Sequence, residues 1–249
     1  MSGFGRNVYG LGATALGIVG LVFGDFASVW QPVPDALPGR KALAYLVALA
    51  FLAAGLALQP RKTSRWGSYA LVLLYGAILF LVHTPRVMVH PMRFAPWTGL
   101  AEQLGVFAGG LAVLSLEPTT PAAARLARLA QIAFGVALIS FAAAHFVYLK
   151  ETAALVPAWL PPGATVWAWA TGVAQLAAAV AILAGVMPLL AARALTAMFV
   201  VFQALVHVPS VLHDPKSHAN WAANAVNLTL VGAAWAIGDV IAKHRKAAS

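Results

Sequence analysis

The segment Leu81-Val82-His83-Thr84-Pro85-Arg86-Val87 recurs 124 residues later as Leu205-Val206-His207-Val208-Pro209-Ser210-Val211. The same spacing relates Pro91 to Pro215 and Trp97 to Trp221. Chance repeats of Ala and Leu are common in an apolar chain, but shared His, Pro and Trp residues at a constant spacing are not. The pattern therefore predicts an internal duplication.

A second pair of motifs extends the duplication toward the start of each half. Val33-Pro34 and Leu37-Pro38 recur as Val156-Pro157 and Leu160-Pro161, now 123 residues apart. Before these prolines, Phe26 aligns with Phe146, and Asp25 therefore aligns with His145. We expect the two halves to share their helices but to differ in their polar side chains.

The composition is that of a membrane protein. Of the 249 residues, 61% are hydrophobic and 9% are charged, and the mean hydropathy is +0.83, whereas soluble domains carry about 25% charged residues. Eight crossings of about 20 residues each use most of the chain, which excludes a large domain outside the membrane. The absence of cysteine from the sequence excludes disulfides and thiolate metal sites.

Eight apolar runs predict an all-α integral membrane protein with eight transmembrane helices. The predicted spans are 7–29, 42–59, 67–88, 98–116, 129–149, 165–186, 189–211 and 220–242. Each half holds four spans and returns the chain to its starting side, so the halves form two parallel four-helix repeats, residues 1–120 and 121–249. A helix-breaking segment near Glu117–Ala124 marks the boundary between them.

The basic residues predict the orientation. Of the sixteen Lys and Arg residues, ten fall on the side that holds both termini and six on the other side. Because cytoplasmic loops are enriched in Lys and Arg, we expect a multi-pass protein of the cell inner membrane with both termini in the cytoplasm. The net charge of +9 is spread over both faces, which excludes nucleic acid as a partner and leaves the lipid bilayer.

Polar residues in the second half form a candidate ligand-binding site in the outer part of the spans. Polar groups within a membrane span are costly and often mark a ligand site. Gln203 and His207 are four residues apart, as are Asn220 and Asn224, so each pair shares a helix face. The candidate ligand-binding residues are His145, Gln175, Gln203, His207, Asn224 and Asn227.

The first half holds a secondary polar cluster of Asp25, His83 and Glu102, which suits ion pairing or proton handling. Amides and neutral histidines can donate to and accept from carbonyl oxygens without burying a net charge. The second half is therefore the better candidate for ligand binding. A buried hydrogen-bond network that only stabilises helix packing is the alternative interpretation of both clusters.

The second half also resembles the DoxX family. The resemblance rests on Ala144-His145-Phe146, on Val156-Pro157-Ala158-Trp159-Leu160-Pro161-Pro162, on Trp167 and on Thr171-Gly172-Val173-Ala174-Gln175-Leu176. Gln175 stands where the family often carries Glu. The family comprises small four-helix bacterial inner-membrane proteins, some of them tied to respiratory or redox modules. The resemblance implies a tandem, eight-helix relative with a membrane redox partner subunit.

The sequence leaves the cofactor open. Aromatic residues beside a polar cluster suit a quinone, whereas His83 and His207, on different helices, are the candidate axial ligands of a haem b. Each of these histidines precedes a proline by two residues, so its ring could instead cap a helix carbonyl that the proline leaves free. The alternative metal-binding sets are His83, Met88, His90 and Met92, or His207, His213 and His218. Both sets lack tight ligand spacing, so we assign no metal ligand.

The leading function hypothesis is a redox-associated binding or anchor subunit that holds a quinone-like or lipid-like molecule in the outer leaflet. A transporter or channel for a small solute is one alternative, and a structural scaffold for a membrane complex is another. The sequence contains no nucleotide-binding glycine loop, serine-nucleophile motif or zincin motif. We therefore expect that the chain is not an enzyme by itself.

Overall fold

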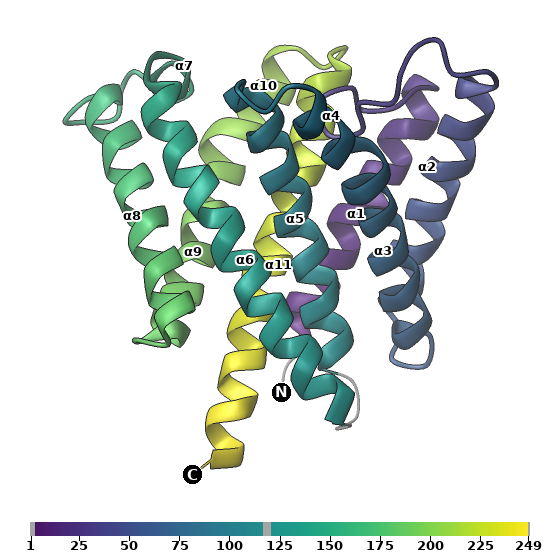
Figure 1. The fold of residues 1–249 in the computed structure, drawn as a ribbon. Helices are drawn as coiled ribbons and strands as arrows, with labels where there is room; N and C mark the ends of the chain where they lie inside the picture. Colours follow the sequence, from purple (N-terminus) through teal and green to yellow (C-terminus); the bar gives the residue numbers. More distant parts are fainter. Residues whose placement is uncertain (1–2, 117–120, 249) are drawn as a thin grey trace.

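The computed structural model describes residues 3–116 and 121–248, and this part of the chain consists of helices joined by short loops (Figure 1). The helices are α1 (Phe4–Phe23), α2 (Arg40–Ala57), α3 (Ser64–Ile78), η1 (Leu79–His83), α4 (Thr84–Val89), α5 (Phe94–Ser115), α6 (Pro121–Val147), α7 (Leu149–Ala154), α8 (Ala164–Ala184), α9 (Pro188–Phe202), η2 (Gln203–His207), α10 (Val208–His213) and α11 (His218–Ala248). No strand occurs in the described residues, so the predicted all-α class is confirmed. The predicted repeat boundary at Glu117–Ala124 lies largely outside them.

Among the described residues, eight helical stretches are long and apolar enough to cross a membrane. The third and the seventh, Ser64–Val89 and Pro188–His213, are composite. Each joins two α-helices through a five-residue π-helix, η1 or η2, which ends two residues before a proline. A proline has no backbone N–H to donate to the carbonyl four residues earlier, as an α-helix would require. The wider π-helical turn therefore loses fewer hydrogen bonds at this point than an α-helical turn would. The predicted eight membrane-length helices, typical of a multi-pass membrane protein, are confirmed.

The first span ends earlier than predicted. The sequence predicts helix over 7–29, but α1 stops at Phe23 because Gly24 adopts a left-handed conformation (φ 65°) and its N–H donates to the Gly20 carbonyl. Glycine adopts this conformation without the strain that a side chain would cause. Asp25, which the sequence places inside the span, therefore lies in the loop that follows it.

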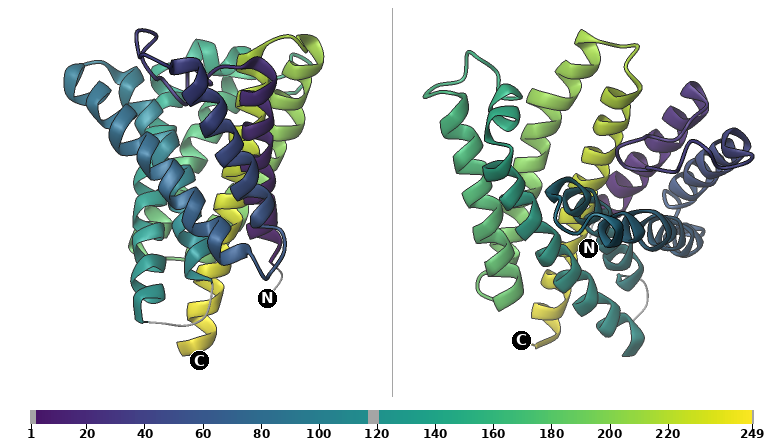
Figure 2. Two further views of the ribbon diagram at one scale, coloured as in Figure 1. Left: turned by 90° about the vertical axis from the view of Figure 1, so that its right-hand side faces the viewer. Right: turned by 45° about the horizontal axis from the view of Figure 1, so that its top comes forward.

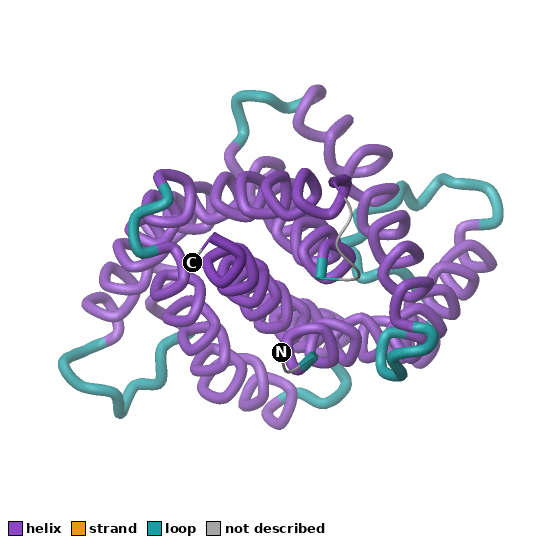
Figure 3. Tube along the Cα trace, turned by 90° about the horizontal axis from the view of Figure 1, so that it is seen from below, coloured by secondary structure: helices purple, strands orange, loops and turns teal. Residues whose placement is uncertain are grey.

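The helices α5 and α11 form the centre of the bundle. α11 packs against α1, α5 and α9, and α5 packs against α3, α6 and α11. Figure 3 shows α11 in the middle of the surrounding helices, and the left view of Figure 2 shows α1 running beside it. Most of α11 is therefore buried within the protein, although its composition would allow it to face lipid.

Both termini lie at one end of the bundle, here named the terminal end, together with the connections 58–63 and 185–187 (Figure 1). The opposite end, named the loop end, carries the longer connections 24–39 and 155–163 and the short helices α4, α7 and α10 (Figure 1). The histidines that end η1 and η2 lie next to α4 and α10, and so toward the loop end.

Two glycines let α1 and α11 touch through their backbones. A Cβ atom on Gly232 would overlap the backbone of Tyr9, and one on Gly12 would lie 2.5 Å from the backbone nitrogen of Thr229. Because protein interiors are already close-packed, no larger residue fits at either position without moving a helix. This contact joins the first and last helices of the chain and closes the bundle.

Candidate functional site

A cavity of about 740 Å³ lies between α5, α6, α8, α9, η2 and α11, beneath the connection between α7 and α8. Its walls are mostly apolar and aromatic, and include Phe141, Trp167, Phe199 and Phe202. Small-molecule sites in proteins typically have volumes of about 300–1,000 Å³ and similarly apolar walls. The cavity is therefore large enough for an organic molecule.

Four of the six candidate ligand-binding residues line this cavity: His145, Gln175, His207 and Asn227. They belong to α6, α8, η2 and α11, so four separate helices each bring one polar group to the same space. An apolar wall with a few convergent polar groups is the arrangement that orients a bound molecule and distinguishes it from plain lipid.

The other two candidates, Gln203 and Asn224, form a hydrogen-bond network with Asn227. The Asn227 amide donates to the Phe199 carbonyl (3.0 Å) and to Gln203 Oε1 (2.7 Å). Gln203 in turn donates to Asn224 Oδ1 (2.7 Å). Gln203 and Asn224 are not among the described residues that line the cavity, and their contacts hold Asn227 in place.

His145 is held at the cavity wall by contacts with α8 and α9. Its Nδ1–H donates to the Phe141 carbonyl (2.9 Å), and its ring stacks on Phe202 with the ring centres 6.4 Å apart. A Cβ atom on Gly172 would lie 2.8 Å from the Cβ of His145, so α8 approaches α6 this closely only because residue 172 is glycine. The second ring nitrogen, Nε2, is left for a ligand.

Gln175 and His207 line the cavity without a protein partner. Gln175 is 2% exposed, and its Oε1 has no hydrogen-bond partner in the part of the chain that the structure describes. His207 likewise makes no hydrogen bond to any described residue. Leaving a buried polar group unsatisfied costs about 1–3 kcal/mol. Both side chains thus keep hydrogen-bonding capacity for a bound molecule.

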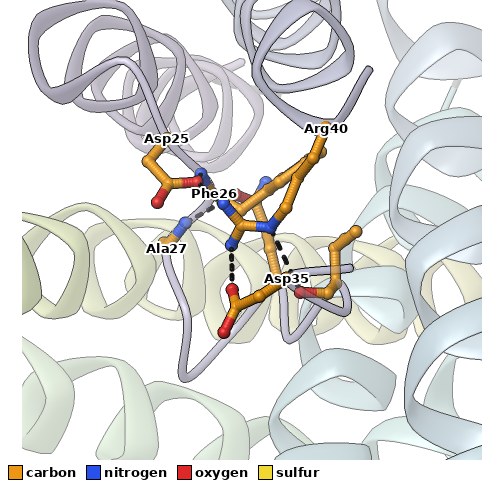
Figure 4. A network of polar contacts seen from close by, with 7 residues as sticks. Asp25, Phe26, Ala27, Asp35 and Arg40 are labelled. Carbon is orange, nitrogen blue, oxygen red and sulfur yellow. Dashed lines mark hydrogen bonds and ion pairs between the residues drawn. The ribbon is translucent and has the colours of Figure 1, made fainter. Parts of the chain in front are cut away.

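The structure places Asp25 in a different set of contacts from the other two members of the predicted secondary polar cluster. Asp25 accepts hydrogen bonds from the Phe26 backbone N–H (2.6 Å) and from the Arg40 guanidinium. Arg40 also pairs with Asp35 (3.3 Å) and lies over the Phe26 ring, 5.4 Å from its centre (Figure 4). These contacts brace the loop that joins α1 to α2, and Asp25 is part of that brace.

His83 contacts Trp30, a residue that the sequence analysis did not select. The His83 Nε2–H donates to the Trp30 carbonyl (3.0 Å), and the Trp30 side chain lies close to the Glu102 carboxyl group. The interpretation that His83 caps a carbonyl of its own helix is therefore wrong. Trp30 and Glu102 line the cavity, although both belong to the first half of the chain, whereas His83 is buried behind them.

The arrangement of the histidines bears on the metal and haem alternatives. No group of three or more His, Asp or Glu side chains in the described residues could hold a metal ion. His83 bonds to Trp30 and is not among the residues that line the cavity with His207, so the two histidines do not share one binding space. The cavity instead offers hydrogen bonds to the polar group of an apolar molecule.

The described residues contain eight helical stretches long and apolar enough to cross a membrane, as in a multi-pass membrane protein, and a cavity of small-molecule size beneath the connection between α7 and α8. A family model with the description "Domain of unknown function (DUF8561)" matches residues 134–238, from α6 to α11. No curated protein and no solved structure matches the chain. The matched segment includes every cavity residue from α8, α9, η2 and α11, and thus most of the site.

Proposed function

We propose that the protein binds a quinone-like or lipid-like amphiphile in this cavity, within the outer leaflet of the inner membrane. The observation that carries the proposal is the cavity of about 740 Å³, in which apolar walls surround the unpartnered Gln175 and His207. The walls suit a ring or an alkyl chain, because burying apolar surface is favourable at about 25 cal/mol per Å². The polar residues then select the head group.

The side of the bundle offers a route of entry. Ala170 and Ala174 on α8 and Val201 on α9 line the cavity and are exposed. We propose that the cavity opens to lipid at these residues. An amphiphile can therefore enter sideways from the bilayer, between α8 and α9, without crossing the polar headgroup region.

The orientation follows from the basic residues. Ten of the sixteen Lys and Arg residues lie toward the terminal end by the predicted topology, and loops enriched in these residues stay in the cytoplasm. Both termini are therefore cytoplasmic in this proposal, and the loop end faces outward. The cavity, which lies beneath the connection between α7 and α8, then belongs to the outer leaflet.

This orientation predicts the labelling of single cysteines, which the cysteine-free chain accepts without prior substitution. Pro34→Cys and Pro215→Cys, both exposed at the loop end, should react with a membrane-impermeant maleimide added to spheroplasts, whereas Lys62→Cys at the terminal end should not. Lysed membranes, in which all three should react, are the control. Labelling of Lys62→Cys alone would move the cavity to the inner leaflet.

The proposal includes a duplicated four-helix unit, because equivalent positions make equivalent contacts. The π-helices η1 and η2 are 124 residues apart. Gln103 donates to the Tyr75 carbonyl (2.8 Å) as Asn227 donates to the Phe199 carbonyl (3.0 Å), again with a spacing of 124. α1 packs against α11 as α5 packs against α6. These pairs support two parallel repeats related by a pseudo-two-fold axis along the membrane normal.

The redox association of the proposal rests on the position of the DoxX-like residues. His145, Pro157, Trp167, Ala174 and Gln175, which carry part of that resemblance, all line the cavity. A family-like segment that builds a binding site is what a shared ligand would require. The protein is then a binding or anchor subunit that holds the amphiphile for a redox partner in the membrane.

The direct experiment is mass spectrometry of the small molecules that co-purify with the protein in mild detergent. A molecule enriched over the bulk lipid extract, at up to one copy per chain, is the expected result. His207→Ala is expected to reduce its amount about tenfold, because a lost hydrogen bond of about 1.4 kcal/mol changes affinity by that factor. His83→Ala, which removes a histidine outside the cavity, is expected to reduce it less.

Two outcomes would contradict the proposal. If no molecule is enriched and both histidine variants lower only the thermal stability of the protein, the polar residues serve packing, as in a scaffold. If both variants lose the molecule equally while their stability is unchanged, the two halves contribute alike to a symmetric site, and the assignment of ligand binding to the second half is wrong.

A further inference from the structure

For some hydrogen-bonding groups of the cavity, contacts within the protein fix whether the group can donate to a ligand or accept from it. Asn227 is one of these groups. Its Nδ2 donates one hydrogen to the Phe199 carbonyl and the other to Gln203 Oε1. A carbonyl oxygen can only accept, so the amide cannot be reversed, and its donors are both used. The atom that Asn227 can offer to a ligand is therefore its oxygen, Oδ1.

Contacts within the protein also fix which ring nitrogen of His145 carries the proton. Its Nδ1 lies 2.9 Å from the Phe141 carbonyl, which accepts, so Nδ1 must carry the proton. In a neutral imidazole only one nitrogen is protonated, and the other is an acceptor. His145 therefore presents the lone pair of Nε2 to the cavity.

Glu102 is the one Asp, Glu, Lys or Arg among the described residues that line the cavity. Its carboxyl group accepts hydrogen bonds when it is ionised and can also donate one when it is protonated. The protein therefore does not determine the direction in which Glu102 bonds to a ligand.

The donors of the cavity wall are used within the protein. The Trp30 side chain lies close to the Glu102 carboxyl group, and the Trp167 indole N–H donates to the Pro161 carbonyl (2.9 Å). The hydroxyls of Thr98 and Thr171 donate to carbonyls of their own helices, each at 2.8 Å. The cavity residues that remain adaptable are Glu102, His207, Gln175, Tyr148 and Thr152. These can either donate or accept, so they give no preference of their own.

We propose that the cavity selects an amphiphile whose head group donates hydrogen bonds, through hydroxyl or ammonium groups, over one whose head group only accepts them. The inference rests on the proposed function and names the ligand class for the same site. The two groups with a determined direction, Asn227 Oδ1 and His145 Nε2, are both acceptors. A head group that only accepts would leave these two without partners, and unsatisfied buried acceptors are costly.

The test compares two probes that differ only in their donors, decylhydroquinone and decylbenzoquinone. Purified protein in detergent is titrated with each, and the rise in melting temperature gives the dissociation constant. A thiol reductant keeps the hydroquinone reduced without harming the protein, because the chain has no disulfide to lose. We expect the hydroquinone to bind at least about tenfold more tightly, as one additional hydrogen bond of about 1.4 kcal/mol would give.

A third probe, decylammonium, distinguishes a ligand with an ammonium head group from one with a hydroxyl head group. Tighter binding of decylammonium than of decylhydroquinone assigns an ammonium head group that pairs with Glu102, and the reverse order assigns a hydroxyl head group. His145→Phe keeps an aromatic ring beside Phe202 but removes the Nε2 acceptor, so it should reduce the preference for either donor probe about tenfold. Glu151→Gln, at an exposed position on α7 outside the cavity lining, should leave the preference unchanged.

The results that would contradict the donor preference differ from those that would contradict the amphiphile site itself. Equal or tighter binding of decylbenzoquinone would overturn the donor preference and leave the amphiphile site intact. Absence of binding by all three probes would overturn the site itself, and the donor preference with it. An unchanged preference in His145→Phe would show that the determined acceptors do not select the head group and would contradict the inference.

Discussion

Gly232→Ala is expected to destabilise the protein by about 3 kcal/mol, the upper end of the usual cost of overpacking. The added Cβ would overlap the backbone nitrogen and Cα of Tyr9, and backbone atoms cannot rotate away as a side chain can. α1 and α11 would have to separate along the contact that closes the bundle. Chemical or thermal unfolding in detergent micelles, followed by tryptophan fluorescence, measures the change.

Gly105→Ala is the matched control for this prediction. It lies on α5, facing α11, and its nearest neighbour is the terminal methyl of Leu230 at 3.2 Å, which can turn aside. Both variants gain the same intrinsic helix propensity, about 1 kcal/mol, so their difference reports the contact alone. Equal stability of the two variants would mean that the α1–α11 contact is looser than described.

The double variant Ala170→Trp/Ala174→Trp is expected to remove at least nine-tenths of the co-purifying amphiphile. Both alanines line the cavity one helical turn apart on α8, and both are exposed. Two indoles at these positions fill part of the cavity and block the proposed entry between α8 and α9. We expect the fold to survive, because the new side chains occupy space that no protein atom holds. Quantitative mass spectrometry per folded chain measures the loss.

The control for the double variant is Val166→Trp/Val173→Trp. These valines lie on the same helix, are 52% and 55% exposed, and do not line the cavity among the described residues. They add comparable bulk on the outer surface, so the amphiphile should be retained. Retention by both double variants would place the bound molecule elsewhere on the protein. Loss from both would indicate that α8 is generally perturbed.

The helices were predictable because the thickness of a bilayer sets their length. A run of about 20 apolar residues is long enough to cross, and turns and charged residues interrupt such runs. The end of α1 was predicted wrongly because apolar residues continue past Gly24, while the left-handed conformation of that one glycine ends the helix. The π-helices were not predicted at all, since a proline indicates a weak point in a helix but not how the backbone adapts to it.

The polar residues of the site were predictable as a set but not in their roles. An amide or histidine in an apolar span stands out from its neighbours, and so His145, Gln175, His207 and Asn227 could be selected before the cavity was known. Trp30 could not, because a tryptophan near a span end is typical of an interfacial anchor. Its hydrogen bond with His83 joins residues 53 positions apart along the chain, which local patterns do not record.

The sequence alone predicted the all-α class and the eight membrane-length helices, because hydropathy is a property of the chain that depends on no tertiary contact. It also determined which half carries the richer set of polar groups. The tertiary structure decided which of these groups face one space and which hydrogens remain unused. Both depend on helix packing: Gly172 allows α8 to approach His145, and the Phe199 carbonyl takes a hydrogen from Asn227. From the sequence, the amides and histidines of the pocket can each donate or accept hydrogen bonds. In the structure, the two groups whose direction is fixed, on Asn227 and His145, can only accept hydrogen bonds from a ligand.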